Sequence, residues 1–434
     1  MSTDVYKVRR LERKKDIVVE VPGSKSITNR ALLLAALSDG ITILKGTLFS
    51  DDSRYFLKSL KSLGFLVDID QESKTVIVEG KGGKIPNPSG EINVGSAGTA
   101  ARFLTAMLGL SGGTYTINAS EQMKKRPMRE LFAALERLGV KIKYIENEYH
   151  LPVVIEGRAD NGVNNITLDT NESTQFLSAM LMTGVMNENG ISIRVTGERK
   201  TGAYVNITRK MMGSFGLKNV EYKDDTYYIK PMSKYNTEDG FIYQIEPDVS
   251  AACYFYGIGA VTGIRTIVKN VFMSSMQGDI KFVQVLKDMG CTVEKTDDGI
   301  SVRGPVKPDR LKGIDIDMNN FSDQALTMAA VSIFAEGPVT IRNIGHIRMQ
   351  ESDRLSGMAC ELKKMGIRCE EKKDKITIYP GTPKPCSIET YEDHRMAMAF
   401  TIPGLITGNM EILNPMCCRK TFENYFQVID SLYE

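Results

Sequence analysis

The sequence predicts an α/β protein of two domains, each built from three copies of one repeated unit. Three observations lead to this prediction. The 434 residues exceed what one ordinary hydrophobic core accommodates. A Leu-x-x-Leu-Gly pattern, followed each time by an alternating strand, recurs along the chain. A second pattern, an apolar helix with a small or polar start, recurs between the copies of the first.

The first pattern marks the end of a helix. It occurs as LKSLG, LERLG, LKDMG and LKKMG, with a weaker copy, MGSFG, and its closing glycines are Gly64, Gly139, Gly216, Gly290 and Gly366. Successive glycines lie 75, 77, 74 and 76 residues apart. Glycine is the residue that most often ends a helix in the left-handed conformation. The near-constant spacing therefore predicts one helix end in each repeat.

The second pattern marks the start of an apolar helix. Its six copies begin with residues of types that cap helix N-termini, namely Ser24, Ser96, Ser173, Ser250, Ser322 and Asp393. Each unit is then expected to contain two helices separated by strands, with short extra strands. Exposed N–H groups and the helix dipole make such helix starts suitable for binding anions.

The second pattern occurs six times, but the first pattern, whose closing glycine precedes a strand, occurs only five times. The last repeat therefore lacks this strand. We expect this strand to come from VYKVRRLE near the N-terminus. That arrangement predicts a discontinuous domain of residues 1–21 plus 246–434, with residues 22–245 inserted as the second domain. The chain would cross between domains near residues 21–22 and 245–247, and each domain would hold three units.

Composition excludes several classes of protein. The net charge of +2 gives no electrostatic footprint for nucleic acid, and no apolar stretch reaches the length of a membrane span. The N-terminal segment has no apolar signal core. Seven cysteines without a CxxC motif and only three histidines argue against a disulfide framework or a histidine-based metal site. We expect a reduced, cytoplasmic protein that needs no metal.

Basic side chains gather near the predicted helix starts. They are Lys25, Arg30, Arg102, Arg126, Arg348, Arg354, Arg395 and Lys420. Taken singly, each is most often a solvated surface charge, but their recurrence beside cap-rich turns predicts a site for a multiply anionic ligand. Asp323, Glu351, Asp353 and Asp393 lie in the same segments. A lone carboxylate there is usually a helix cap, whereas carboxylates among cations that hold a substrate suit proton transfer.

Eight motifs in order resemble the 5-enolpyruvylshikimate-3-phosphate synthase family. They are PGSKSITNRALLLAAL, GSAGTAARFL, KRPM, STQFLSA, FSDQALTMAA, NIGHIRMQESDRL, YEDHRMAMAF and RKTFENYF, and they extend from about residue 20 to residue 427. No single motif is decisive, but the ordered set is specific. The resemblance implies a two-domain inside-out α/β barrel. Each domain would have three βαβαββ repeats, with helices buried and sheets outside, and the domains would close over substrate.

The same resemblance implies an activity. It is the transfer of the enolpyruvyl group of phosphoenolpyruvate to the 5-hydroxyl of shikimate 3-phosphate, with release of phosphate, on the route to chorismate and the aromatic amino acids. The reaction would run by addition and elimination through a tetrahedral intermediate. No cofactor is implied, and the expected partners are the two small substrates, bound by a monomer.

Site residues follow position by position from the matching motifs. The catalytic residues would be Lys25, Asp323 and Glu351. Shikimate 3-phosphate would be bound by Lys25, Ser26, Arg30, Ser173, Thr174, Gln175, Thr201, Tyr204, Asp323 and Gln350. Phosphoenolpyruvate would be bound by Lys25, Gly98, Arg126, Gln175, Arg354, Arg395 and Lys420.

The chain departs from the family pattern at four positions. Ser96 and His346 stand where Asn is common, Phe103 where Pro is common, and Gln350 where Lys is common. Gln350 carries no charge, which weakens the expected contact with the shikimate phosphate. Gly98 is retained in the pocket that glyphosate would share with phosphoenolpyruvate, so the chain is a potential target of that herbicide.

Two other functions are compatible with parts of this pattern. UDP-N-acetylglucosamine enolpyruvyl transferase shares the fold and chemistry, but its members usually carry a Cys in a loop of the inserted domain and a Lys-Asn pair at the first helix. Here no Cys precedes Cys253, and the pair is Lys25-Ser26. A catalytically silent protein that binds phosphorylated ligands could lose Asp323 or Glu351, and both are present.

Overall fold

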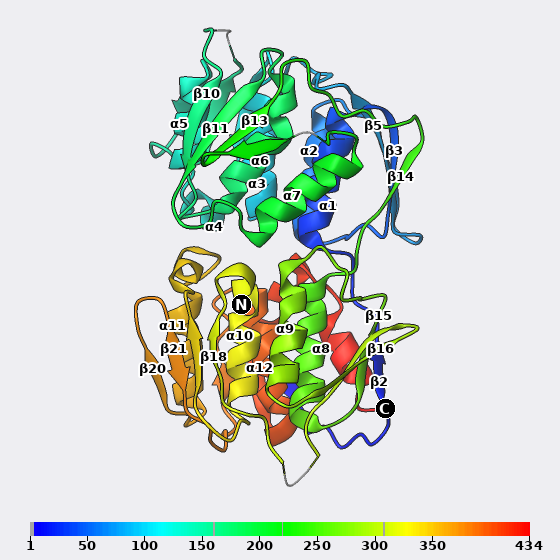
Figure 1. The fold of residues 1–434 in the computed structure, drawn as a ribbon, viewed down its shortest axis with the longest axis vertical. Helices are drawn as coiled ribbons and strands as arrows, with labels where there is room; N and C mark the ends of the chain where they lie inside the picture. The colour runs from blue at the N-terminus through cyan, green and yellow to red at the C-terminus, as the bar shows by residue number, and fades with distance from the viewer. Residues whose placement is uncertain (1–3, 159–160, 219, 307–308) are drawn as a thin grey trace. The chain divides into compact units, whose positions relative to one another are not determined.

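A computed structural model describes residues 4–158, 161–218, 220–306 and 309–434 (Figure 1). The chain forms two compact units of mixed α/β structure. Unit 1 consists of residues 1–22 and 246–434, and unit 2 of residues 23–245. The strands of the described residues form five four-stranded sheets and one three-stranded sheet.

Unit 2 holds three of these sheets. Its helices are α1 (Lys25–Leu37), α2 (Asp51–Ser62), α3 (Gly98–Gly109), α4 (Glu121–Lys124), α5 (Arg129–Arg137), α6 (Thr174–Thr183), η1 (Gly184–Met186) and α7 (Ala203–Ser214). Its strands are β3 (Asp39–Lys45), β4 (Val67–Asp70), β5 (Thr75–Lys81), β6 (Ser89–Asn93), β7 (Thr114–Asn118), β8 (Lys141–Tyr144), β9 (Val153–Glu156), β10 (Asn165–Asp169), β11 (Ile191–Thr196), β12 (Glu221–Lys223), β13 (Thr226–Ile229) and β14 (Phe241–Gln244).

Unit 1 holds the other three sheets. Its helices are α8 (Val249–Thr262), η2 (Gly278–Ile280), α9 (Lys281–Asp288), η3 (Asn319–Gln324), α10 (Ala325–Ser332), η4 (Gly345–Met349), α11 (Arg354–Lys364), α12 (His394–Thr407), η5 (Pro415–Lys420) and α13 (Tyr425–Ser431). Its strands are β1 (Val5–Val8), β2 (Ile17–Val19), β15 (Thr266–Lys269), β16 (Thr292–Thr296), β17 (Gly299–Arg303), β18 (Asp315–Asp317), β19 (Val339–Arg342), β20 (Cys369–Glu371), β21 (Ile376–Ile378), β22 (Ser387–Ile388) and β23 (Met410–Leu413).

All six sheets share one topology. In each, the first pair of strands is parallel and the next pair is antiparallel, as in the order β6-β7-β9-β8. The parallel pairs are β14 with β3, β6 with β7, β10 with β11, β2 with β15, β18 with β19, and β22 with β23. This shared topology is the structural counterpart of the sixfold sequence repeat.

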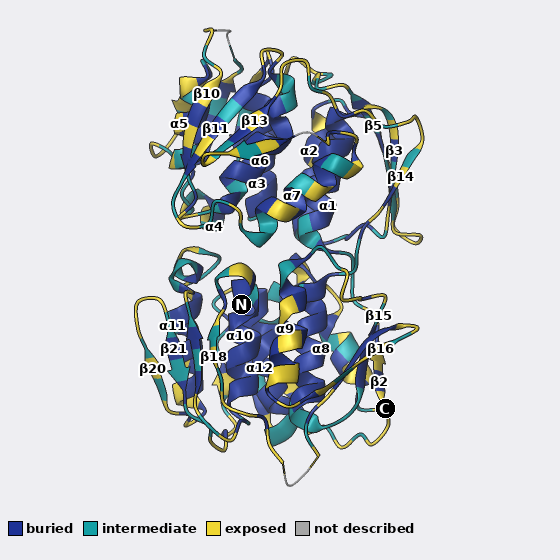
Figure 2. Ribbon diagram, viewed as in Figure 1, coloured by how far each residue is buried: buried dark blue, intermediate teal, exposed yellow. Residues whose placement is uncertain are grey.

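Helices form the interior of each unit and the sheets form its outer layer. Helix α3 is buried along its whole length, and α10 is likewise buried at every position. Figure 2 shows these helices in dark blue. The strands instead alternate, as in β10, where exposed and buried residues follow one another. Apolar helices inside half-exposed sheets are the arrangement of an inside-out α/β fold.

The glycines of the first sequence pattern end helices, as predicted. All five adopt positive φ angles, between 77° and 101°, a conformation that glycine tolerates without the steric cost of a Cβ atom. They are Gly64, Gly139, Gly216, Gly290 and Gly366.

The predicted helix starts are only partly confirmed. Ser24, Ser173 and Asp393 are N-cap residues of α1, α6 and α12. The N-cap of α3 is Ala97 rather than Ser96, and that of α8 is Asp248 rather than Ser250. Asp248 precedes the serine, and its carboxylate accepts a hydrogen bond from the backbone N–H of Ala251. Ser322 lies inside η3, because the non-helical backbone of Phe321 delays the start of α10 to Ala325.

The N-terminal segment supplies the strand that the sixth repeat lacks, as predicted. Strand β1 pairs antiparallel with β23, from Val5 opposite Leu413 to Val8 opposite Met410. Two further strands were not expected. Strand β2 pairs with β15, and β14, the last strand of unit 2, returns to pair with β3. Among the described residues, none of the helices is both long and apolar enough to cross a membrane.

The pairing of β1 predicts a local energetic cost. Val8 is 1% exposed, so Val8→Ala should remove about 2 kcal/mol from the free energy of unfolding, for two lost methylene equivalents and the cavity they leave. Val5→Ala, at a 40% exposed position of the same strand, is the matched control and should cost under about 0.5 kcal/mol. Urea titration of both variants measures the difference. Equal losses in the free energy of unfolding would show that the packing of Val8 in β1 contributes little to the core.

Candidate active site

Lys25 begins the first buried helix of unit 2. It is the first residue of α1, and its Nζ lies 3.4 Å from a carboxylate oxygen of Asp52 in α2. The Asp52 side chain is 2% exposed and that of Lys25 is 16% exposed. The ion pair therefore holds the ammonium group at the end of the Lys25 side chain, while part of this side chain stays exposed.

Arg30 is almost completely buried one turn further along α1. Its Nε donates to Thr208 Oγ1 (2.8 Å), and its Nη1 donates to the Ser26 carbonyl (2.9 Å). Nη2 donates to Ser178 Oγ (3.3 Å) and to the Tyr204 carbonyl (3.4 Å). Burial lowers the pKa of Arg30 to about 10, which leaves it charged at neutral pH. Arg30 therefore links α1 to α6 and α7 beside Ser26.

Gly98 and Arg126 are in direct contact in unit 2. A Cβ atom added at Gly98, the first residue of α3, would lie 2.4 Å from Arg126 Nη1. Buried Arg102 supports both segments, since it donates to the Gly98 carbonyl (3.2 Å) and to the Pro127 carbonyl (3.1 Å). Burial, and then the charge of Arg126, lower the pKa of Arg102. Glycine is thus required where the guanidinium of Arg126 meets the backbone.

The starts of α6 and α7 carry the remaining predicted residues of unit 2. Ser173 caps α6 by accepting from the Gln175 N–H (3.2 Å), and Thr174 is buried beside it. The amide oxygen of Gln175 is buried without a hydrogen-bond partner among the described residues. At α7, the ring of Tyr204 lies under the Arg30 guanidinium. Thr201 is exposed one residue before the N-cap Gly202, and no contact in the described structure joins its side chain to the others.

Arg354 and Asp393 form the buried centre of the candidate site in unit 1. Arg354 Nε donates to Asp393 Oδ2 (2.7 Å) and Nη2 donates to Oδ1 (3.2 Å), a two-point contact between side chains that are 3% and 0% exposed. Burial lowers the pKa of Arg354. The negative charges of Asp393, Asp323 and Glu351 outweigh burial, with Asp393 contributing most, so the pKa is raised overall. Burial raises the pKa of Asp393, yet Arg354 holds it below its ordinary value.

Asp323 is held by two guanidinium groups. Arg354 Nη1 donates to its Oδ1 (3.2 Å) and Arg395 Nη2 donates to its Oδ2 (2.9 Å). The Asp323 side chain is 12% exposed, which is more than either arginine. Arg395 also lies 3.5 Å from the hydroxyls of Tyr254 and Ser250. Of these three charged groups, the carboxylate is therefore the most exposed.

Glu351 lies between a histidine and a lysine. Its Oε2 is 3.0 Å from His394 Nδ1 and 3.4 Å from Lys420 Nζ. His394 follows Asp393 at the start of α12, whereas Lys420 ends η5. The structure therefore brings together the predicted residues Asp323, Glu351, Arg354, Arg395 and Lys420 from four separate segments of unit 1.

Two of the departures from the family pattern have local partners. Gln350 Oε1 accepts a hydrogen bond from Arg354 Nη1, so this uncharged side chain helps to hold the guanidinium group in place. His346 Nε2 lies 2.8 Å from Ser322 Oγ, next to Asp323. Both residues are therefore integrated in the unit 1 network.

Glu351, Asp393 and His394 are near enough to one another to share a cation, among the described residues. Lys420 already contacts Glu351, and Arg354 already contacts both oxygens of Asp393. These side chains supply the positive charge that a metal would bring, so we assign no step to a metal.

Sequence reasoning missed three residues beside these clusters. Asp52, Asp279 and His394 are all 6% exposed or less. His394 lies inside the motif YEDHRMAMAF, whereas Asp52 and Asp279 lie outside all eight motifs. A sequence pattern does not reveal which buried polar side chain lies next to which site residue.

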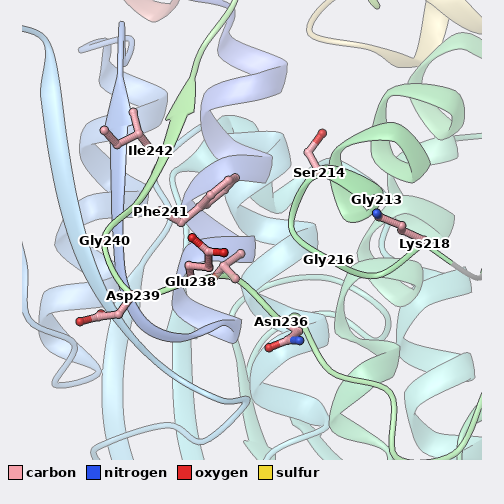
Figure 3. A pocket seen from close by; sticks show the side chains of 11 residues that line it. Gly213, Ser214, Gly216, Lys218, Asn236, Glu238, Asp239, Gly240, Phe241 and Ile242 are labelled. Atoms are coloured by element: carbon pink, nitrogen blue, oxygen red, sulfur yellow. The ribbon is translucent and has the colours of Figure 1, made fainter.

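A surface pocket of about 570 Å³ lies elsewhere in unit 2 and contains none of the predicted site residues. The pocket is lined by Ser214 at the end of α7, by Lys218 beyond that helix, and by residues 236–242 before and within β14 (Figure 3). Asp239 Oδ1 accepts from the Ile41 N–H (2.8 Å), so this carboxylate caps the edge of a sheet. The pocket lacks the clustered cations that the predicted chemistry requires.

The fold and these clusters define an α/β enzyme that acts on anionic substrates. A family model described as EPSP synthase (3-phosphoshikimate 1-carboxyvinyltransferase) matches residues 11–429. The 3-phosphoshikimate 1-carboxyvinyltransferase of Nostoc punctiforme is 40% identical over 423 residues, covering 98% of both chains. The chloroplastic enzyme of that name from Arabidopsis thaliana is 37% identical over 429 residues, covering 96% of this chain and 82% of the relative.

A solved structure of EPSP synthase from Acinetobacter baumannii has the same fold, with a TM-score of 0.81 and 24% sequence identity over 99% of this chain and 98% of that one. The chain belongs to the EPSP synthase (3-phosphoshikimate 1-carboxyvinyltransferase) family. It has the transferase activity of that family, a step of the shikimate pathway.

The buried pair of Arg354 and Asp393 predicts a stability effect. Asp393→Asn should lower the free energy of unfolding at neutral pH by about 3–5 kcal/mol, because it leaves a buried guanidinium without its countercharge. The pKa of Asp393 is lower in the folded chain than its ordinary value of about 3.9. Its contribution is therefore present above about pH 4 and is lost as the pH falls towards the lowered pKa.

Asp353→Asn is the matched control for this pair. Asp353 also caps a helix and also pairs with an arginine, Arg348, but it is exposed. Its substitution should cost about 1 kcal/mol. Urea titrations at neutral and acidic pH compare the two variants, and equal costs would contradict a central role for the buried pair.

Proposed function

We propose that the chain transfers the enolpyruvyl group of phosphoenolpyruvate to the 5-hydroxyl of shikimate 3-phosphate through a tetrahedral intermediate, with Asp323, Glu351 and Lys25 as its catalytic residues. The observation that carries this proposal is the cluster in unit 1. Two carboxylates, Asp323 and Glu351, lie among Arg354, Arg395 and Lys420. Such a cluster can bind an anionic substrate and exchange protons with it.

In the addition step, the 5-oxygen forms a bond to C2 of phosphoenolpyruvate. Asp323 accepts the hydroxyl proton, while Glu351 or Lys25 delivers a proton to C3. Asp323 is at present neutralised by Arg354 and Arg395. A phosphoenolpyruvate carboxylate or phosphate that takes over these guanidinium groups would leave Asp323 with less positive charge. Substrate binding would thus make it a better proton acceptor.

In the elimination step, the bond between C2 and the phosphate oxygen breaks and its electron pair leaves with phosphate. The methyl group at C3 returns a proton to the acid that delivered it, which restores the double bond. Asp323 gives its proton to the leaving phosphate. Glu351 is suited to a two-way transfer because His394 and Lys420 contact the same oxygen. The two carboxylates also stabilise positive charge that develops at C2.

Residues of unit 2 are proposed to hold the substrates. Lys25, Ser26 and Arg30 at the start of α1 and Ser173, Thr174 and Gln175 at the start of α6 would bind shikimate 3-phosphate, together with Thr201 and Tyr204. The unpartnered amide oxygen of Gln175 is available for a substrate hydroxyl. Gly98 and Arg126 would bind phosphoenolpyruvate, with Arg354, Arg395 and Lys420 of unit 1. Gln350 would complete the contacts to shikimate 3-phosphate.

The experiment that tests the function is an assay of phosphate release. The protein is mixed with phosphoenolpyruvate and shikimate 3-phosphate, and in parallel with phosphoenolpyruvate and UDP-N-acetylglucosamine. We expect phosphate only with shikimate 3-phosphate. Release with the nucleotide sugar alone would assign the other enolpyruvyl transfer, and binding of both ligands without release would identify a silent binding protein.

Asp323→Asn should reduce turnover by at least about 100-fold, because the amide cannot accept the hydroxyl proton. Phosphoenolpyruvate binding should not be weakened, because the neutral amide competes less than the carboxylate for Arg354 and Arg395, and calorimetric titration measures this affinity. Asp315→Asn is the control, since Asp315 is also paired with an arginine, Arg342, but is exposed. Turnover of the Asp323 variant within a factor of about two of the wild type would remove Asp323 from the chemistry.

Gly98→Ala should raise the KM for phosphoenolpyruvate about tenfold, because the new methyl group displaces the guanidinium of Arg126. The KM for shikimate 3-phosphate should change much less. Gly112→Ala is the matched control, since an added Cβ there meets no atom within 4 Å. Steady-state kinetics measure both constants. An unchanged KM for phosphoenolpyruvate would show that Arg126 does not bind this substrate.

The chain is further proposed to act as a monomer in the cytoplasm. All seven cysteines are unpaired, which is compatible with a reducing compartment. Sedimentation equilibrium measures the mass of the active species, and a dimer would correct this proposal.

A further inference from the structure

Asp279 is a buried carboxylate that the proposed reaction does not yet use. It lies in η2, and its side chain is 6% exposed. Its Oδ2 accepts a hydrogen bond from Ser250 Oγ and a second from Gln324 Nε2 at 3.1 Å. Both donors are neutral side chains, and no cationic donor among the described residues contacts this buried carboxylate, whereas arginines donate to Asp393 and Asp323.

The two donors to Asp279 connect it to the site. Ser250 Oγ is 3.5 Å from Arg395 Nη2, and the same Nη2 donates to Asp323. Gln324 follows Asp323 directly in η3, and its own Oε1 accepts a hydrogen bond from Thr327. Asp279 is therefore connected to Arg395 through the Ser250 side chain. It is connected to the backbone next to Asp323 through the Gln324 side chain.

We propose that Asp279 is a positioning residue of the enolpyruvyl transfer, which orients Arg395 through Ser250 and Asp323 through Gln324. This inference rests on the proposed function, since it assigns a use to Asp279 only if Arg395 binds substrate and Asp323 transfers a proton. A carboxylate is suited to this task because its single oxygen Oδ2 accepts from both donors at once.

The charge of Asp279 makes the arrangement sensitive to pH. Burial and then the charge of Asp323 raise its pKa to about 6, while Arg395 opposes the shift. Asp279 is therefore charged above about pH 7 and becomes neutral as the pH falls through 6. Once protonated, the carboxyl group carries no charge and is a weaker acceptor, so the hydrogen bonds from Ser250 and Gln324 to it weaken.

The groups that face Asp279 come from several elements. Asp323 and Gln324 lie in η3, Arg395 in α12, and Ser250 and Cys253 in α8. Burial raises the pKa of the Cys253 thiol, which keeps it neutral. On α9, which continues from η2, the charged residue nearest in sequence is Lys281, and it is exposed. Asp323 and Arg395 are therefore the charges coupled to Asp279.

The test is the pH dependence of Asp279→Asn. The asparagine keeps the size of the side chain but has one acceptor oxygen and two additional donor hydrogens. At about pH 8 we expect kcat/KM for phosphoenolpyruvate to fall about 10- to 100-fold below the wild type. At about pH 5, where Asp279 of the wild type is itself protonated, the ratio of the two rates should approach one. A ratio that is constant across the pH range, or equal to one throughout, would overturn the inference.

Controls separate this test from folding and from the proposed function. Asp288→Asn, an exposed carboxylate at the end of α9, should leave the pH profile unchanged. Thermal melts at about pH 8 should show Asp279→Asn folded and at least as stable as the wild type, because it removes a buried charge. Ser250→Ala removes the connection between Asp279 and Arg395 and leaves Gln324 as the donor to Asp279, and it should raise the KM for phosphoenolpyruvate. An unchanged KM in that variant would overturn the proposed path.

The wild-type rate at about pH 8 tests the proposed function by itself. Without phosphate release from phosphoenolpyruvate and shikimate 3-phosphate, both the function and the role of Asp279 fail. An active wild type with a pH-independent rate ratio rejects only the role of Asp279.

Discussion

The constraint on which the structure of unit 1 depends is that buried charges need opposite charges in contact. Arg354 and Asp393 are both almost inaccessible to water, and each would be costly to bury alone. Their two-point contact joins the start of α11 to the start of α12. Since Arg354 also contacts Asp323 and Gln350, the pair fixes the helix starts around which the other polar side chains are arranged.

This arrangement explains how helices that are almost entirely apolar can carry a charged site. Helices α8, α10 and α12 are buried along nearly their whole lengths, and Ser250, Asp323 and Arg395 of the polar network lie at or just before their first residues. In unit 2, Lys25, Gly98 and Ser173 likewise lie at the starts of α1, α3 and α6. The helix interiors supply the hydrophobic core, while their N-terminal ends supply N–H groups, dipoles and anchored side chains for anions.

Much of the fold could be predicted from the sequence because repetition amplifies weak signals. One Leu-x-x-Leu-Gly is common, but five at constant spacing indicated helix ends, and all five glycines have the expected conformation. The strand at Val5–Val8 could also be predicted, because the last repeat lacked a partner. The pairings of β2 and β14 could not, since strands of three or four residues carry too little pattern to select a distant neighbour.

The site was harder to predict than the fold. The charged residues could be named because they lie in recognisable motifs, and in unit 1 the structure brings five of them into one network. Asp279 could not be found, because its hydrogen-bond donors Ser250 and Gln324 are 29 and 45 residues away in the sequence. Nothing in the sequence indicated that Arg30 connects α1, α6 and α7 by hydrogen bonds. A cation among apolar residues gives no sequence signal that distinguishes substrate binding from internal bonding.

The central claim is that anionic substrate takes over the guanidinium groups of Asp323 and thereby prepares it to accept a proton. Calorimetric titration of phosphoenolpyruvate, with shikimate 3-phosphate present, in two buffers of different ionisation enthalpy measures the protons exchanged on binding. The inactive Glu351→Gln variant, compared with the double variant Glu351→Gln/Asp323→Asn, isolates the contribution of Asp323. We expect greater proton uptake when Asp323 is present, because a carboxylate that loses its guanidinium partners binds a proton more readily. Equal proton exchange in the two proteins would contradict this claim.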